Sequence, residues 1–202
     1  MKRVIALFCT VFVLVVNGEA QSYRIGAYAH PQANFLGKKS PVKGKGFTMG
    51  GGVFFEHNIF DAFTYALGLG YTQCNNTYTS EDTTENGTNK LGFVSLPITI
   101  TYNFYATDIF KVGLHTGIGI NYLVSGKQII DGNEEIMNLS ELKFEKKLYF
   151  MVTIGISATY LFTEKIGISL IPTFSYFSVF NPATTRYLGV GGQIRFFYEF
   201  GY

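Results

Sequence analysis

Five charged residues interrupt stretches that are otherwise rich in apolar, glycine and hydroxyl-bearing side chains. Charges of both signs in such surroundings could pass protons or solutes along a path, or could pair with one another as buried ion pairs. An unpaired charge in a low-dielectric interior is strongly disfavoured, so pairing is the interpretation that we prefer. The residues of this predicted charge network are Arg24, Glu56, Lys111, Arg195 and Glu199.

Two histidines, His30 and His115, could act as metal ligands or as the base of a serine nucleophile. Neither has a carboxylate at a matching position of its own segment, so we predict no metal site and no cofactor. His30, Ser40 and Asp82 could meet only through the fold, and their spacing does not favour it. We therefore predict no catalytic residue. A lipid-modifying enzyme stays open as an alternative.

The strongest structural signal is residues 148–162, LYFMVTIGISATYLF. Every even position is apolar, and most odd positions are small or carry a hydroxyl group. A period of two indicates a β-strand whose two faces meet different surroundings. Ten or eleven tilted residues already cross the hydrocarbon layer of a membrane. The pattern is typical of an outer-membrane barrel strand, with apolar residues toward lipid and small or polar ones toward the lumen.

Eight segments share this alternation, which predicts an all-β, eight-stranded, antiparallel, up-and-down transmembrane barrel over residues 21–202. On this parity the five charges face the lumen in its periplasmic half. An eight-stranded barrel is just wide enough for side chains to fill, so we predict a plugged lumen. A secreted lipocalin-like barrel would instead turn its apolar face inward around a ligand. The segments are 22–30, 47–57, 62–74, 91–105, 109–125, 148–162, 166–178 and 187–202.

The connections between these segments alternate in length, which predicts short periplasmic turns and longer extracellular loops. Within the third long loop, residues 133–144 either coil or extend the hairpin outward. Proline removes a donor from the sheet, so we expect Pro97 and Pro172 to form local bulges inside their strands. The predicted extracellular loops are 31–46, 75–90, 126–147 and 179–186.

Residues 1–20 are predicted to be a cleaved export signal. Lys2 and Arg3 precede an apolar run over residues 4–16, and small residues lie just before Gln21. Cleavage would leave Cys74 as the one cysteine, so no internal disulfide is expected. The net charge of +2 indicates no nucleic-acid partner. Lysines of the first long loop could bind lipopolysaccharide phosphates; they are Lys38, Lys39, Lys43 and Lys45.

Residues 93–102, FVSLPITITY, resemble the aromatic-x-x-hydrophobic-Pro-hydrophobic strand of PorT-like outer-membrane barrel proteins of the Bacteroidota. The aromatic carboxyl terminus, with Phe196, Tyr198, Phe200 and Tyr202, resembles the signal that the barrel-assembly machinery reads. The resemblance implies an outer-membrane location and insertion by that machinery. It implies less about activity, because only the family's namesake is tied to a secretion system.

Together these observations predict a monomeric, non-enzymatic outer-membrane barrel. Its expected role is structural support of the envelope, surface binding through its loops, or service as a scaffold in a secretion complex. The partner of the loops is left open.

Overall fold

The computed structural model describes residues 22–36, 42–59, 62–80, 86–130, 133–136, 147–179 and 187–201. The predicted export signal, residues 1–20, lies outside this part of the chain, as do Ser40 and Asp82. No helix in the described part is long and apolar enough to span a membrane. The strands are β1 (Ser22–Leu36), β2 (Val42–Ile59), β3 (Phe63–Ser80), β4 (Asn86–Ala106), β5 (Phe110–Ile130), β6 (Asn133–Ile136), β7 (Leu148–Leu161), β8 (Ile166–Val179) and β9 (Tyr187–Gly201).

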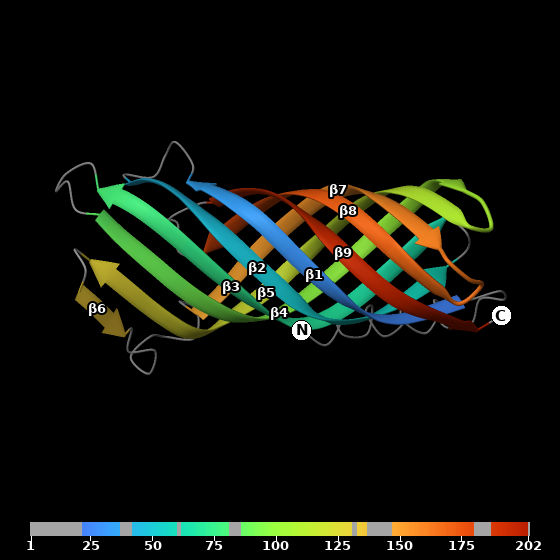
Figure 1. Ribbon diagram of the computed structural model, residues 1–202, viewed down its shortest axis with the longest axis horizontal. Helices are drawn as coiled ribbons and strands as arrows, with labels where there is room; N and C mark the ends of the chain where they lie inside the picture. The colour runs from blue at the N-terminus through green and yellow to red at the C-terminus, as the bar shows by residue number, and fades with distance from the viewer. Residues whose placement is uncertain are drawn as a thin grey trace, which may run out of the picture.

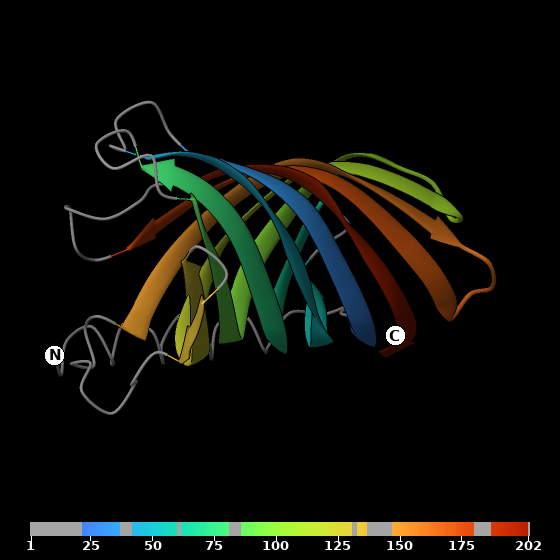
Figure 2. The ribbon, with the colours of Figure 1, turned by 60° about the vertical axis from the view of Figure 1, so that its left-hand side comes forward.

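Eight of these strands form one closed antiparallel barrel. The sheet runs β4-β3-β2-β1-β9-β8-β7-β5, and an additional pairing of β4 with β5 closes the ring. Within the described residues, the short strand β6 pairs with the end of β5 alone, outside the ring. The strands run obliquely around the barrel, with β6 and the carboxyl end of β9 at opposite ends (Figures 1 and 2). The predicted eight-stranded barrel is confirmed.

Several strands are longer than the sequence predicted, mainly at the end where β6 lies. β3 continues to Ser80 and β4 begins at Asn86, so most of the predicted loop 75–90 is strand. β1 continues through Pro31 to Leu36, and β2 begins at Val42. Polar residues such as Asn75 and Asn76 therefore pair within the sheet, opposite Lys90 and Asn89. Of the stretch 133–144, residues 133–136 extend the β5 hairpin outward, and the rest lies outside the described residues.

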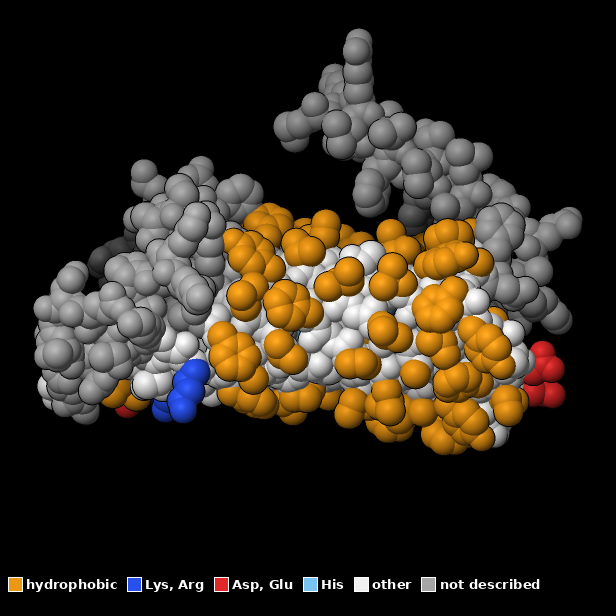
Figure 3. Space-filling view, turned by 90° about the horizontal axis from the view of Figure 1, so that it is seen from above, with side chains coloured by type: hydrophobic (Ala, Val, Ile, Leu, Met, Phe, Trp, Pro, Cys, Tyr) orange, Lys and Arg blue, Asp and Glu red, His pale blue; other side chains and the backbone are white. Residues whose placement is uncertain are grey.

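The two faces of the barrel have opposite chemistry. On β7, Ile154 and Ile156 point outward and are more than half exposed, whereas Thr153 and Ser157 on either side of them point inward and are buried. The same alternation repeats on the other strands, so apolar side chains cover the outer surface as a broad band (Figure 3). A lipocalin-like barrel would need the reverse arrangement. An apolar outer face is what a lipid-spanning barrel requires.

The prediction that Pro97 and Pro172 form bulges is wrong. The pairing register is the same on both sides of each proline, and only the pairs around the missing donor are absent from the β3–β4 and β7–β8 ladders. The bulges lie elsewhere, between β4 and β5, where the register shifts after Gly92 and after Asn103. Proline is tolerated at these positions because the strand on one side can lose a hydrogen bond while the strand on the other side keeps the pairing register.

Candidate functional site

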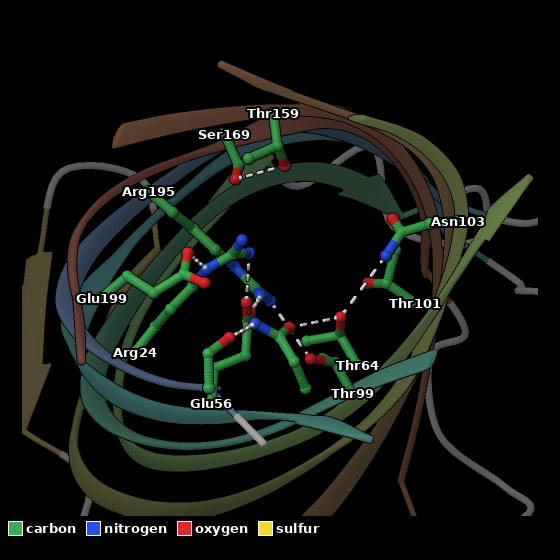
Figure 4. Close-up of polar contacts among 12 residues, drawn as sticks. Arg24, Glu56, Thr64, Thr99, Thr101, Asn103, Thr159, Ser169, Arg195 and Glu199 are labelled. Carbon is green, nitrogen blue, oxygen red and sulfur yellow. Dashed lines mark hydrogen bonds and ion pairs between the residues drawn. The ribbon is translucent and has the colours of Figure 1, made fainter. Parts of the chain in front are cut away.

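The pairing register places three of the predicted charges side by side. Arg24 on β1 lies directly opposite Glu56 on β2 and Glu199 on β9. All three alternate inward, so their side chains meet inside the barrel (Figure 4). Arg24 Nη1 donates to Glu56 Oε1 at 2.9 Å, and Arg24 Nε donates to Glu199 Oε2 at 2.7 Å. One arginine thus bridges two carboxylates on its neighbouring strands.

Arg195 joins this group from β9, the same strand that holds Glu199. Its Nη1 donates to Glu56 Oε2 at 3.0 Å, and its Nη2 donates to Thr99 Oγ1 at 3.1 Å on β4. Its Nε donates to Gln193 Oε1 at 2.8 Å. Glu56 therefore accepts from both arginines, one on each oxygen. Its side chain is 7% exposed and those of its partners are 4% and 5% exposed, so the pairs are nearly dry.

Aromatic rings complete the surroundings of the two guanidinium groups. Arg24 lies over the Phe197 ring at 4.4 Å from its centroid, and Arg195 lies 5.2 Å from the centroid of Phe54. Cation–π contacts of this kind are favourable when both groups are desolvated. Arg24 Nη2 is buried and lacks a hydrogen-bond partner within the described residues. The charge network is thus anchored on two sides by rings that also fill lumen volume.

The fifth predicted residue, Lys111, does not share these ion pairs. It lies on β5 opposite Thr159 of β7, and no ion pair joins it to another residue that the structure describes. Four of the five predicted residues therefore meet in the structure, but the sequence alone did not show which ones. The meeting depends on strand order, because β1 and β9, at opposite ends of the sequence, pair with each other in the closed barrel.

Next to the charge network, on the side toward the β6 end, lies a small layer of polar side chains that includes two histidines. His115 Nδ1 lies 2.9 Å from Thr101 Oγ1, and His30 Nε2 lies 3.2 Å from Thr173 Oγ1. They border a cavity of about 40 Å³, room for only a few water molecules. Within the described residues no group of three or more His, Cys, Asp or Glu side chains could hold a metal ion. Hydroxyl partners orient these rings, and no described carboxylate bonds to either of them.

Toward the β6 end, Cys74 lies in a buried cluster of polar side chains. Its Sγ accepts hydrogen bonds from Asn76 Nδ2 at 2.9 Å, Thr48 Oγ1 at 3.3 Å and Asn34 Nδ2 at 3.4 Å. Gln32 Nε2 donates to Asn34 Oδ1 at 2.7 Å and extends the cluster along β1. The thiol is buried and free. These side chains fill one wall of the lumen across β1, β2 and β3.

An aromatic cluster fills the opposite wall at the same end. Phe93 and Leu123 are fully buried, and the Phe93 ring contacts Tyr149 and Phe177 at centroid distances of 5.0 and 5.8 Å. Sequence reasoning missed this cluster because it treated inward positions as small or polar. The available signal was that Phe93, Leu123, Tyr149 and Phe177 all fall on the inward parity of their strands.

Comparisons with known proteins found likenesses of fold. No protein-family model and no curated protein matches the chain. Neisserial surface protein A is 14% identical with a TM-score of 0.47, over 88% of this chain and 98% of that one. Ail, the attachment invasion locus protein of Yersinia pestis, is 12% identical with a TM-score of 0.44, over 91% and 100%. The outer membrane protein OprG from Pseudomonas aeruginosa is 11% identical with a TM-score of 0.43, over 90% and 96%.

Proposed function

We propose that this protein is an outer-membrane β-barrel with a plugged lumen and a non-enzymatic role. The observation that carries the proposal is the outer face, where apolar side chains such as Ile154, Leu67 and Phe174 are about half exposed around a closed ring. A water-soluble protein would expose far smaller apolar patches. A lipid bilayer is the solvent in which such a surface is stable.

Three layers of side chains support the plug. The charge network of Arg24, Glu56, Arg195 and Glu199 crosses the lumen near the end of the barrel where the short turns lie. The layer around His30 and His115 leaves only a small cavity, and the clusters around Cys74 and Phe93 fill the lumen at the other end. We propose that a narrow barrel filled in this way has no continuous water path. Its role therefore depends on its outer surface and its extended strands, as envelope support, surface binding or a scaffold for a secretion complex.

Wild-type protein is expected to show little or no ion conductance in planar bilayers, because the lumen is filled at three levels. The measurement is single-channel recording of the purified barrel, repeated with Arg195→Ala. Steady wild-type conductance that Arg195→Ala leaves unchanged would contradict the plug, because the network would then border an open path without obstructing it.

The proposed orientation places the β6 end outside the cell and the short turns in the periplasm. In a Cys74→Ala background, a membrane-impermeant maleimide applied to whole cells is expected to label Glu135→Cys on β6. It should not label Thr163→Cys, in the exposed turn after β7, until the cells are lysed. Labelling of Thr163→Cys but not of Glu135→Cys in whole cells would reverse the orientation. Recovery of the protein in the soluble fraction, with both cysteines labelled equally, would contradict the membrane location.

Further parts of the proposal come from the sequence. They are the resemblance of the β4 segment to PorT-like proteins of the Bacteroidota, insertion by the barrel-assembly machinery, a monomeric state, and lipopolysaccharide as a surface partner. The resemblance rests on residues 93–102 and on the aromatic residues of β9. A pull-down with the intact barrel is the experiment that would identify a partner of the loops.

A further inference from the structure

The outer surface of the barrel carries a groove near the β6 end, over β3, β4 and β5. It has a volume of about 460 Å³, and its polar border includes Lys90, Lys127, Gln73 and Ser125. Val124 and Ile136 form apolar parts of the wall. Lysine and arginine side chains in this part of the molecule lie at the edge of the apolar band in Figure 3. The groove thus lies where an apolar surface gives way to a charged one.

Two lysines of the groove lie directly opposite each other. Lys90 on β4 pairs in register with Lys127 on β5, and both side chains are exposed. Like charges directly opposite on one face of a sheet destabilise it. Glu134 on β6 forms an ion pair with Lys127 Nζ at 2.8 Å and offsets one of the two charges. No ion pair joins Lys90 to another described residue, so the three groups carry a net charge of +1.

A β-bulge creates this arrangement. Gly92 pairs with Ser125 and Phe93 pairs with Leu123, so Val124 is the extra residue of β5. Val124 and Ser125 are both exposed as a result, and the alternation reverses beyond them. Without the bulge, Lys127 would point toward the lumen, because Leu123 does. Bulges commonly re-aim side chains in this way at functional positions.

An apolar surface lies directly below the lysines. Val94 pairs with Tyr71 on one side and with Tyr122 on the other, which places a row of two tyrosines and a valine across three strands. Val94 lies four residues from Lys90, about 13 Å along the strand. Tyrosine is favoured at the membrane–water interface. The lysines therefore lie at headgroup depth, and the surface below them, with Val94 and Leu96, lies at acyl-chain depth.

We propose that this groove binds the phosphate of an outer-leaflet lipid between Lys90 and Lys127. A phosphomonoester of the lipid A type offers several acceptor oxygens to two ammonium groups and relieves their mutual repulsion. Its acyl chains continue over Val94 and Leu96 in the same orientation as the surrounding lipid. The proposal rests on the membrane location argued above and adds a specific ligand class and site.

The test is native mass spectrometry of the purified barrel in detergent, titrated with diphosphoryl lipid A. Each lysine near a phosphate contributes roughly 1 kcal/mol, about fivefold in affinity, so Lys90→Gln with Lys127→Gln should weaken binding roughly 25-fold. Glu134→Gln removes the competing carboxylate and should strengthen binding severalfold. Lys165→Gln, at the opposite end of the barrel, is the matched control and should change nothing. Millimolar inorganic phosphate should not displace the lipid.

Equal binding by wild type and the double lysine variant overturns the proposal, as does loss of binding with Glu134→Gln. Complete displacement by inorganic phosphate shows an ion site and overturns the assignment to lipid. Misfolding cannot explain the gain expected from Glu134→Gln, and heat-modifiable gel mobility verifies that each variant is folded. The double lysine variant should still insert and still show no conductance, so its failure to bind leaves the proposed barrel function separately testable.

Discussion

Glu56→Ala is expected to destabilise the folded barrel by about 3–5 kcal/mol, one of the two largest effects that the structure predicts. Glu56 is the acceptor that both Arg24 and Arg195 share, so its loss leaves two nearly dry guanidinium groups short of a counter-charge. Arg24 would retain Glu199, whereas Arg195 would retain only neutral acceptors. The measurement is urea unfolding of the barrel in lipid vesicles, followed by heat-modifiable gel mobility.

Glu199→Ala is the matched control for this prediction. It removes a carboxylate from the same row, but one with a single arginine partner and a side chain that is 16% exposed. Water can partly replace it, so we expect a clearly smaller loss of stability than for Glu56→Ala. Equal losses in the two variants would show that Glu56 does not have the central position that its two ion pairs indicate.

Ile154→Arg is expected to cost about 2–4 kcal/mol, because it places a charge on the lipid face near the membrane midplane. Ile154 lies in the middle of β7 and is 51% exposed on the outer surface. In water, an exposed isoleucine could be replaced by arginine at little cost. The size of the effect therefore reports whether lipid surrounds this face, and the same unfolding assay measures it.

Ile109→Arg makes the same chemical change at a different depth. Ile109 is 58% exposed in the short connection between β4 and β5, where a charged side chain reaches water. We expect a loss of about 0–1 kcal/mol there, as for charges near the interfaces. If both variants lost the same stability, depth would not matter, and the assignment of a lipid-facing band would be contradicted.

In the middle of the strands, the sequence was enough to predict which face most side chains occupy. Strict alternation decides this strand by strand, without knowledge of the partner strands, because a strand has a period of two. Arg24, Glu56, Arg195 and Glu199 all fall on the inward parity, and the structure brings these four together. Which carboxylate each arginine meets could not be predicted, because that depends on the register between strands far apart in sequence.

The ends of the strands and the β-bulge could not be predicted from the sequence, for a different reason. At this end of the barrel the outward face of a strand also carries polar residues, so residues such as Asn75, Thr77 and Asn89 lose the alternation while their backbone still pairs. The reversal of the inward–outward alternation at Val124 could not be predicted from the sequence either, because an extra residue in one strand is recognised only from its pairing with the neighbouring strand. The prolines were misjudged because their effect also depends on the neighbouring strand.

The buried thiol of Cys74 has a consequence for the order of events during assembly. Once the barrel has closed, Asn34, Thr48 and Asn76 surround the sulfur, and reagents cannot reach it. Before closure the same thiol is accessible. In an oxidising compartment, a mixed disulfide formed at that stage would bring its adduct into a wall with no space for it. We therefore expect a reductant during refolding to raise the yield of closed barrels.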